Sequence, residues 1–106
     1  MTLGDNMENQ LCTKFEEAFQ LLGKRWTGLI LNQLMNGPKR FNEIESEIKI
    51  SGKVLSERLK ELEKLDIINR HVYPETPVRI EYELTKKGYS LKPIMEEISK
   101  WSDVWI

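Results

Sequence analysis

Hydroxyl and cationic side chains share one side of residues 51–64, the stretch whose residue types best suit contact with a polyanion. At about 3.6 residues per turn, a stripe of leucines falls on the other side: Leu55, Leu59 and Leu62. The polar side carries Lys53, Ser56, Glu57, Lys60 and Lys64. A helix about 10–12 Å wide fits the major groove of DNA, where lysine and serine can reach bases or phosphates. The pattern therefore indicates a DNA-contacting helix, although Glu57 and Glu61 equally suit a solvated amphipathic helix.

Cys12 is the second residue with chemistry of its own, and it is the single cysteine of the chain. It cannot form an intrachain disulfide, so its thiol is either buried or reactive. Thr13 and Glu16 have the spacing of a capping box, so we expect the first helix to begin at Thr13. The helix dipole and the adjacent Lys14 would then favour the reactive thiolate, while nearby glutamates oppose it. The alternative is a small buried residue at a dimer interface.

Apolar spacing predicts four helices within residues 13–64, which would position these side chains. The expected helices cover residues 13–22, 26–35, 41–48 and 51–64. The second is apolar over most of its circumference, which places it at the centre of the core. Gly37 and Pro38 end it, and Ser51 can cap the fourth helix after a turn around Lys49 and Ile50.

Two strands are predicted over residues 69–73 and 78–84, joined by the tight turn 74–77. The second strand alternates, with an inward set of Val78, Ile80, Tyr82 and Leu84. A ribbon directly after the DNA-contacting helix can lay its tip along the DNA backbone, with Arg70 and Arg79 as available cations. Lys39 and Arg40 precede the third helix, whose positive N-terminal end favours phosphate. The order of elements is that of a winged helix-turn-helix: mainly α, with a small β-hairpin wing.

Composition fits one small globular domain of 106 residues, with 31% charged and 40% hydrophobic residues. We expect a mobile arm over residues 1–11 and a single domain over residues 12–106. No apolar run approaches the roughly 20 residues of a membrane span, and the first residues lack the apolar core of a signal peptide, so we expect a cytoplasmic protein without membrane contact. The formal net charge of −1 does not itself indicate nucleic-acid binding. Any positive surface must arise locally.

The C-terminal segment carries an apolar stripe that exceeds the needs of a small core. Thr85 can cap a last helix, on which Ile94, Ile98, Trp101 and Trp105 recur at helical spacing. Pairing this stripe with the first helix of a second copy, which presents Phe15 and Phe19, predicts a homodimer. Two DNA-contacting helices would then lie about 34 Å apart, one turn of DNA. The alternatives are packing within the same chain or a ligand pocket lined by the tryptophans.

Catalytic and metal-binding patterns are weak. His71 is the only histidine and lies on a predicted strand. It forms no nucleophile set that can be argued, and with Cys12 it does not define a metal site. Glycine-rich phosphate loops are absent from the sequence as well. We therefore expect no enzyme, no metal and no cofactor.

The chain resembles the HxlR family of bacterial winged-helix regulators, which is related to the MarR regulators. The similarity spans about residues 12–105 in LGKRWTGLILNQLMNGPKRFNEIE, SGKVLSERLKELEKLDII and VYPETPVRIEYELTKKGYSL, with the turn 73–77 the most specific part. It implies a homodimer, a palindromic operator in double-stranded DNA and usually repression. It also implies that Ser51, Lys53, Ser56 and Arg58 lie on or beside the recognition helix. Helical spacing puts Arg58 at the flank of this helix, so bracing of the wing is its alternative role. The residues expected at DNA are Lys39, Arg40, Ser51, Lys53, Ser56, Arg58, Lys60 and Arg79.

The resemblance is closest to thiol-based sensors that respond to quinones and diamide-like electrophiles and carry a cysteine just before the first helix, as Cys12 does. Thr13 stands where many relatives have proline, and this chain lacks the further cysteines of some sensors. Oxidation would therefore give an intersubunit disulfide or a mixed disulfide with a small thiol, and an electrophile would alkylate Cys12 directly. The alternatives are a structural Cys12 with an unknown ligand, or a winged helix used only for protein contacts.

Overall fold

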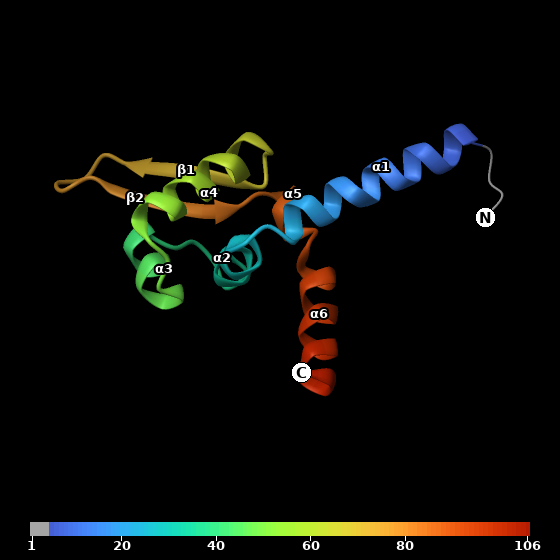
Figure 1. The fold of residues 1–106 in the computed structure, drawn as a ribbon. Coiled ribbons are helices and arrows are strands. Elements are labelled where there is room, and N and C mark those ends of the chain that lie inside the picture. Colours follow the sequence, from blue (N-terminus) through green and yellow to red (C-terminus); the bar gives the residue numbers. More distant parts are fainter. Residues whose placement is uncertain (1–4) are drawn as a thin grey trace.

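All four helices and both strands predicted ahead of residue 85 are present, and together they form a winged helix-turn-helix. This computed structural model describes the backbone of residues 5–106 and the side chains of residues 13–106. In chain order the elements are α1 (Asp5–Leu22), α2 (Thr27–Leu34), α3 (Phe41–Ile48), α4 (Gly52–Lys64), β1 (Ile68–Tyr73), β2 (Arg79–Leu84), α5 (Lys86–Tyr89) and α6 (Lys92–Trp105). Figure 1 shows α2, α3, α4 and the hairpin grouped in one body, from which α1 and α6 extend.

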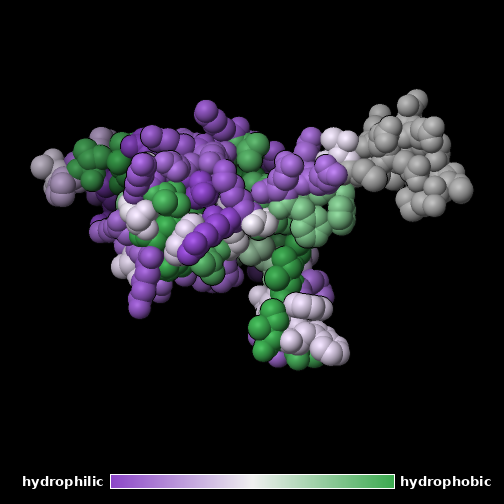
Figure 2. Space-filling model, viewed as in Figure 1, coloured by the Kyte–Doolittle hydropathy of each residue, from purple (hydrophilic) through white to green (hydrophobic). Residues whose placement is uncertain are grey.

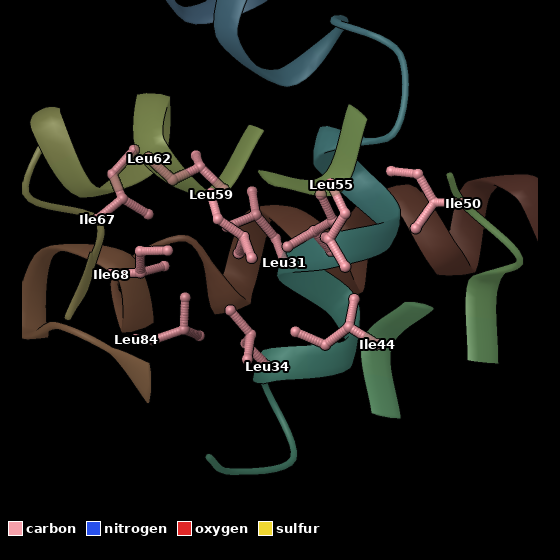
Figure 3. Packing of buried hydrophobic residues seen from close by; sticks show 11 residues of the cluster. Leu31, Leu34, Ile44, Ile50, Leu55, Leu59, Leu62, Ile67, Ile68 and Leu84 are labelled. Atoms are coloured by element: carbon pink, nitrogen blue, oxygen red, sulfur yellow. The ribbon is translucent and has the colours of Figure 1, made fainter. Parts of the chain in front are cut away.

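The hydrophobic core lies where α2, α3 and α4 meet the base of the hairpin (Figure 3). Its buried members are Ile30, Leu31, Leu34, Ile44, Ile50, Leu55, Leu59, Leu62, Ile67, Ile68 and Leu84. The leucine stripe predicted on residues 51–64 is among them, between 0% and 2% exposed. Burying one such side chain contributes about 1.5–3 kcal/mol, so this cluster fixes the orientation of α4 and leaves its polar face outward.

The wing is an antiparallel pair in which Ile68 faces Leu84 and Tyr73 faces Arg79. The predicted inward alternation of the second strand holds for Leu84, which is 3% exposed. It is wrong for Val78, which is 59% exposed because it lies before β2, in the turn at the wing tip.

A short backbone pairing joins the wing to the segment before α3. The Lys39 N–H donates to the Tyr82 carbonyl at 2.9 Å, and the Tyr82 N–H donates to the Lys39 carbonyl at 2.8 Å. This bridge lies next to the α3 N-terminus, so it fixes the position of the helix-turn-helix relative to the wing.

Helix α1 begins earlier than the capping box at Thr13 predicts. It starts at Asp5 and ends at Leu22, where the Gly23 N–H donates to the Phe19 carbonyl at 2.7 Å. Cys12 therefore lies inside the helix rather than just before its first turn. The mobility of residues 1–11 stays a prediction, since residues 1–4 lie outside the described range and residues 5–11 belong to α1.

The predicted last helix is divided into α5 and α6. The Thr85 hydroxyl oxygen accepts from the Gly88 N–H at 3.1 Å, which confirms the cap, but α5 ends at Tyr89. Helix α6 restarts with Pro93 in its first turn. Pro93 has no N–H to donate to the carbonyl four residues earlier, so the hydrogen-bond ladder of α5 cannot continue unbroken into α6.

Gly88 allows α5 to approach the base of the wing, and its replacement by alanine is expected to destabilise the fold. A Cβ at this position would overlap the Ile67 carbonyl and lie 2.9 Å from Leu84 Cδ2. Overpacking of this kind costs about 1–3 kcal/mol. We expect Gly88→Ala to lower the melting temperature by roughly 5–15 °C in calorimetry, given the size of the domain.

Gly28→Ala is the matched control for that variant. An added Cβ at Gly28, within α2, meets no atom within 4 Å. Alanine favours a helix by about 1 kcal/mol over glycine, so this variant should melt at the same or a slightly higher temperature. A Gly88→Ala protein as stable as the parent would contradict the proposed close packing of α5.

Helices α1 and α6 give the chain an extended shape. The radius of gyration is 16.3 Å, against about 13 Å for a compact domain of this length. Both helices project from the body in Figure 1, and Figure 2 shows apolar surface along α6. Over residues 5–106, none of the helices combines the length and apolar character needed to cross a membrane.

Candidate nucleic-acid interface

The helix-turn-helix consists of α3, a tight turn and α4. Lys49 ends α3 in a left-handed conformation with φ of 55°. The Ser51 hydroxyl oxygen then accepts from the Val54 N–H at 3.2 Å, which confirms the predicted cap of α4. Because the hydroxyl is engaged at the helix start, Ser51 positions α4 in addition to any contact with DNA.

The outward face of α4 is cationic with one acidic residue in its centre. Lys53, Glu57, Lys60 and Lys64 are all exposed, and Ser56 is half-buried at the flank. Within residues 13–106, none of these four charged side chains forms an ion pair or a hydrogen bond. The predicted face therefore exists and its charges are available to a partner.

Arg58 lies on α4, as the resemblance implies, but its side chain is engaged by residues outside the wing. Its Nε donates to the Arg25 carbonyl at 3.1 Å, and its Nη1 lies 3.3 Å from the Glu61 carboxylate. That carboxylate also accepts from Lys24 Nζ at 2.9 Å. The Arg58 side chain is only 16% exposed. It joins α4 to the loop between α1 and α2, because both of its acceptors lie on that side of the helix.

Lys39 and Arg40 lie beside the α3 N-terminus as predicted. The Glu43 carboxylate accepts from the Arg40 N–H at 2.8 Å, so a negative charge already caps this end of the helix. Lys39 is half-buried by its backbone bridge, while the Arg40 side chain is exposed. Contact between Arg40 and phosphate stays a prediction. The helix terminus itself attracts an anion less than the sequence suggests, because the Glu43 carboxylate already occupies it.

Arg79, predicted as an available cation, is enclosed within the wing. Its Nε and Nη2 each donate to Glu75 at 3.1 Å, and its Nη1 donates to Glu81 at 2.6 Å. The guanidinium carbon lies 3.9 Å from the centre of the Tyr73 ring. The Arg79 hydrogen bond holds the pKa of Glu75 below its usual value, and the two carboxylates raise the pKa of Arg79. With two carboxylates around one guanidinium, Arg79 stabilises the turn and adds no net positive charge.

The cation that the wing does expose is Arg70 on β1. On the neighbouring position, His71 Nε2 lies 3.3 Å from the Glu83 carboxylate. Over residues 13–106 there is no cluster of three potential metal ligands. His71 is therefore part of a cross-strand pair on the wing, not of a metal cluster in the described part of the chain.

The six residues predicted at a dimer interface are all exposed in the single chain. Their exposed fractions are 65% for Phe15, 62% for Phe19, 46% for Ile94, 51% for Ile98, 59% for Trp101 and 73% for Trp105. The described part of the chain therefore leaves about half or more of each of these side chains uncovered. Pro93, Ile94, Ile98 and Trp101 line a shallow groove of about 480 Å³ on α6, together with Glu97.

Several exposed apolar residues were missed by the sequence reasoning. Leu29, on the helix predicted at the centre of the core, is 51% exposed and borders a second groove between α2 and α6, with Trp26 and Met95. Val104 and Ile106 are 72% and 94% exposed beside the α6 stripe. Their hydrophobicity is visible in the sequence, but only the departure of α6 from the body shows that they remain uncovered.

Cys12 lies in the third turn of α1, and its side chain is outside the described residues. The helix-dipole argument for its reactivity therefore fails, because the effect falls off within the first turn of a helix. Its place on α1 puts it on the same helix as Phe15 and Phe19, whose rings lie 4.8 Å apart.

Comparison with known proteins identifies the same architecture. A family model described as HxlR-like helix-turn-helix matches residues 21–106. The chain is 56% identical over 100 residues to the uncharacterized HTH-type transcriptional regulator YvaP of Bacillus subtilis, and the alignment covers 93% of each chain. It is 55% identical over 98 residues to the HTH-type transcriptional regulator YodB of the same bacterium, covering 92% of this chain and 88% of YodB.

Solved structures include YodB in several chemical states. The reduced form matches with a TM-score of 0.79 and 55% identity over 87% of this chain and 91% of that chain. The diamide-treated form matches with a TM-score of 0.74 and 55% identity, covering 87% of this chain and 92% of that chain. The quinone-bound form matches with a TM-score of 0.76 and 49% identity, covering 87% of this chain and 97% of that chain. The oxidized form of the redox regulator HypR matches with a TM-score of 0.81 and 33% identity, covering 86% of this chain and 95% of that chain.

Proposed function

This chain belongs to the HxlR-like helix-turn-helix family, and we propose that it is a homodimeric repressor released from a palindromic operator when Cys12 is oxidised or alkylated. Membership of the family makes the chain a transcriptional regulator of HxlR type. The relatives bear the names of regulators rather than enzymes. DNA binding, dimerisation and thiol chemistry are the three parts of the proposal.

The outward face of α4 is the observation that best supports DNA binding. The core holds the leucine stripe inward, so Lys53 and Lys60 point away from the body on the second helix of the helix-turn-helix. In this motif the second helix enters the major groove with its N-terminal residues at the base edges. Neutralising phosphates with such lysines supplies affinity despite the net charge of −1.

Dimerisation is supported by the two projecting helices. Phe15 and Phe19 on α1 and the stripe on α6 expose large apolar side chains on elements that leave the body. Exposed patches of this kind mark protein interfaces. A second copy supplies the same apolar helices, and a two-fold dimer matches a palindromic operator.

Thiol sensing is supported by the relatives and by the position of Cys12. YodB has been solved in diamide-treated and quinone-bound forms, and HypR is named a redox regulator. Cys12 lies on α1, the helix that we place at the dimer interface. A covalent change there would alter how the two copies pack, and through them the spacing of the two α4 helices.

Lys53→Ala is expected to weaken operator binding about tenfold without lowering the melting temperature. Lys53 is exposed at the start of α4 and has no partner among the described side chains, so its loss leaves the fold intact. The slope of log affinity against log salt is negative, and each lost phosphate contact reduces its magnitude by about 0.9, or about 1.8 for a dimer. A fluorescence anisotropy titration at several salt concentrations measures both quantities.

Lys92→Ala is the control, because it removes the same charge from an exposed position on α6. Equal affinity of the Lys53 variant and the parent would remove Lys53 from the interface. If the parent itself shows no salt-dependent DNA binding, the winged helix serves protein contacts instead.

A further inference from the structure

Glu57 occupies an unexpected place on the proposed recognition helix. It lies in the second turn of α4, four residues after Lys53 and three before Lys60, in the middle of the outward face. Its carboxylate is exposed and makes no ion pair or hydrogen bond with any described side chain. This distinguishes it from Glu61, which is held by Lys24 and Arg58 on the flank of the helix.

An unpaired carboxylate at this position opposes general attraction to DNA. On a helix lying in the major groove it would face the phosphate backbone and electronegative base edges, which would repel it. The α4 face would bind any duplex more tightly with a neutral residue here. A favourable contact is offered only by base edges that carry an exocyclic amine in the major groove, and among these the cytosine N4 amine is the usual partner of a glutamate.

We propose that Glu57 is a specificity-determining residue that accepts a hydrogen bond from a cytosine N4 amine in each half of the operator. This inference rests on the proposed function, because it requires α4 to enter the major groove. Lys53 and Lys60 attract the phosphates of any DNA sequence. Glu57 favours binding only where the base pair that it faces presents a cytosine amine. Since guanine O6 and N7 and thymine O4 are acceptors, they leave the carboxylate without a donor.

A simpler role for Glu57 would be to offset the charges of Lys53 and Lys60 along the helix. Pairs at this spacing stabilise helices weakly. Such a role changes affinity equally for every DNA sequence, whereas base reading changes the preference at one position of each half-site. The two roles therefore predict different outcomes in the same measurement.

The test is a binding selection from a randomised duplex library with the full-length protein, followed by anisotropy titrations on the selected operator and its single-base variants. The parent should select cytosine at one position per half-site and bind the variants at that position about tenfold more weakly. Glu57→Ala should lose this preference and bind random DNA more tightly. Glu57→Gln should shift the preference towards adenine, whose N6 and N7 suit a glutamine.

Glu63→Gln is the matched control, because Glu63 is exposed on the same helix but lies to one side of the outward face. Melting temperatures of all variants should equal that of the parent. The inference is overturned if Glu57→Ala and Glu57→Gln select the parental sequence with unchanged discrimination, if affinity changes equally for every sequence, or if Glu63→Gln loses the same preference. A parent that selects no sequence at all instead refutes the proposed function.

Discussion

Trp101→Ala is expected to convert the proposed dimer largely to monomer. Trp101 is 59% exposed in the single chain and lies between Ile98 and Trp105 on the apolar stripe of α6. A tryptophan at the centre of an interface often contributes about 2–4 kcal/mol to association. This corresponds to roughly 30- to 1000-fold weaker dimerisation. Sedimentation velocity over a dilution series measures the change directly.

Loss of the dimer should also reduce operator binding. A dimer engages two half-sites at once, and linking two binding modules raises avidity by roughly 10²–10⁴. The Trp101 variant should therefore lose far more affinity for a full palindrome than for a single half-site. The same titration on both duplexes separates this effect from damage to α4.

Lys100→Ala is the control for Trp101. Its side chain is 74% exposed on the other side of α6, and its Nζ lies 3.3 Å from the Glu97 carboxylate. Exposed pairs contribute little, so the control should stay dimeric. If Trp101→Ala sediments as the parent does, Trp101 lies outside the interface, and the α6 groove becomes a candidate ligand site.

The body of the fold could be predicted because its determinants are local. The leucine stripe of α4 repeats at helical spacing, and the serine cap and glycine stop lie directly beside the helices that they bound. The start of α1 could not be predicted in the same way. A capping-box pattern at Thr13 looks like a helix start, but residues 5–12 contain no proline or glycine to prevent the helix from extending backwards.

Free charges were harder to predict than helices. Arg58 and Arg79 carry the expected sign, yet each is engaged within the fold. The Arg58 acceptor on Arg25 is 33 residues away in sequence. The partners of Arg79 are close in sequence, but they meet it only because the turn and the strand pairing bring them together. Sequence shows which residues can contact phosphate, while the fold decides which of them remain available.

Cys12→Ser is expected to abolish release from DNA by quinones and diamide while affinity without oxidant stays within about twofold. Serine is close in size but its hydroxyl does not form the nucleophilic species that the thiolate provides. Cys12 is the single cysteine of the chain, so the variant has no thiol left to react. Anisotropy titrations before and after treatment measure release, and the melting temperature verifies the fold.

Mass spectrometry of the treated parent identifies the chemistry behind that response. A quinone adds directly to the thiolate and leaves a stable adduct. Diamide removes two hydrogens from a pair of thiols and leaves a disulfide, either between Cys12 of the two copies or with a small thiol. Joining the two copies requires their Cα atoms to come within about 4.4–6.8 Å, which only an interface built on α1 permits. A Cys12→Ser protein that is still released by these reagents would leave Cys12 with a structural role.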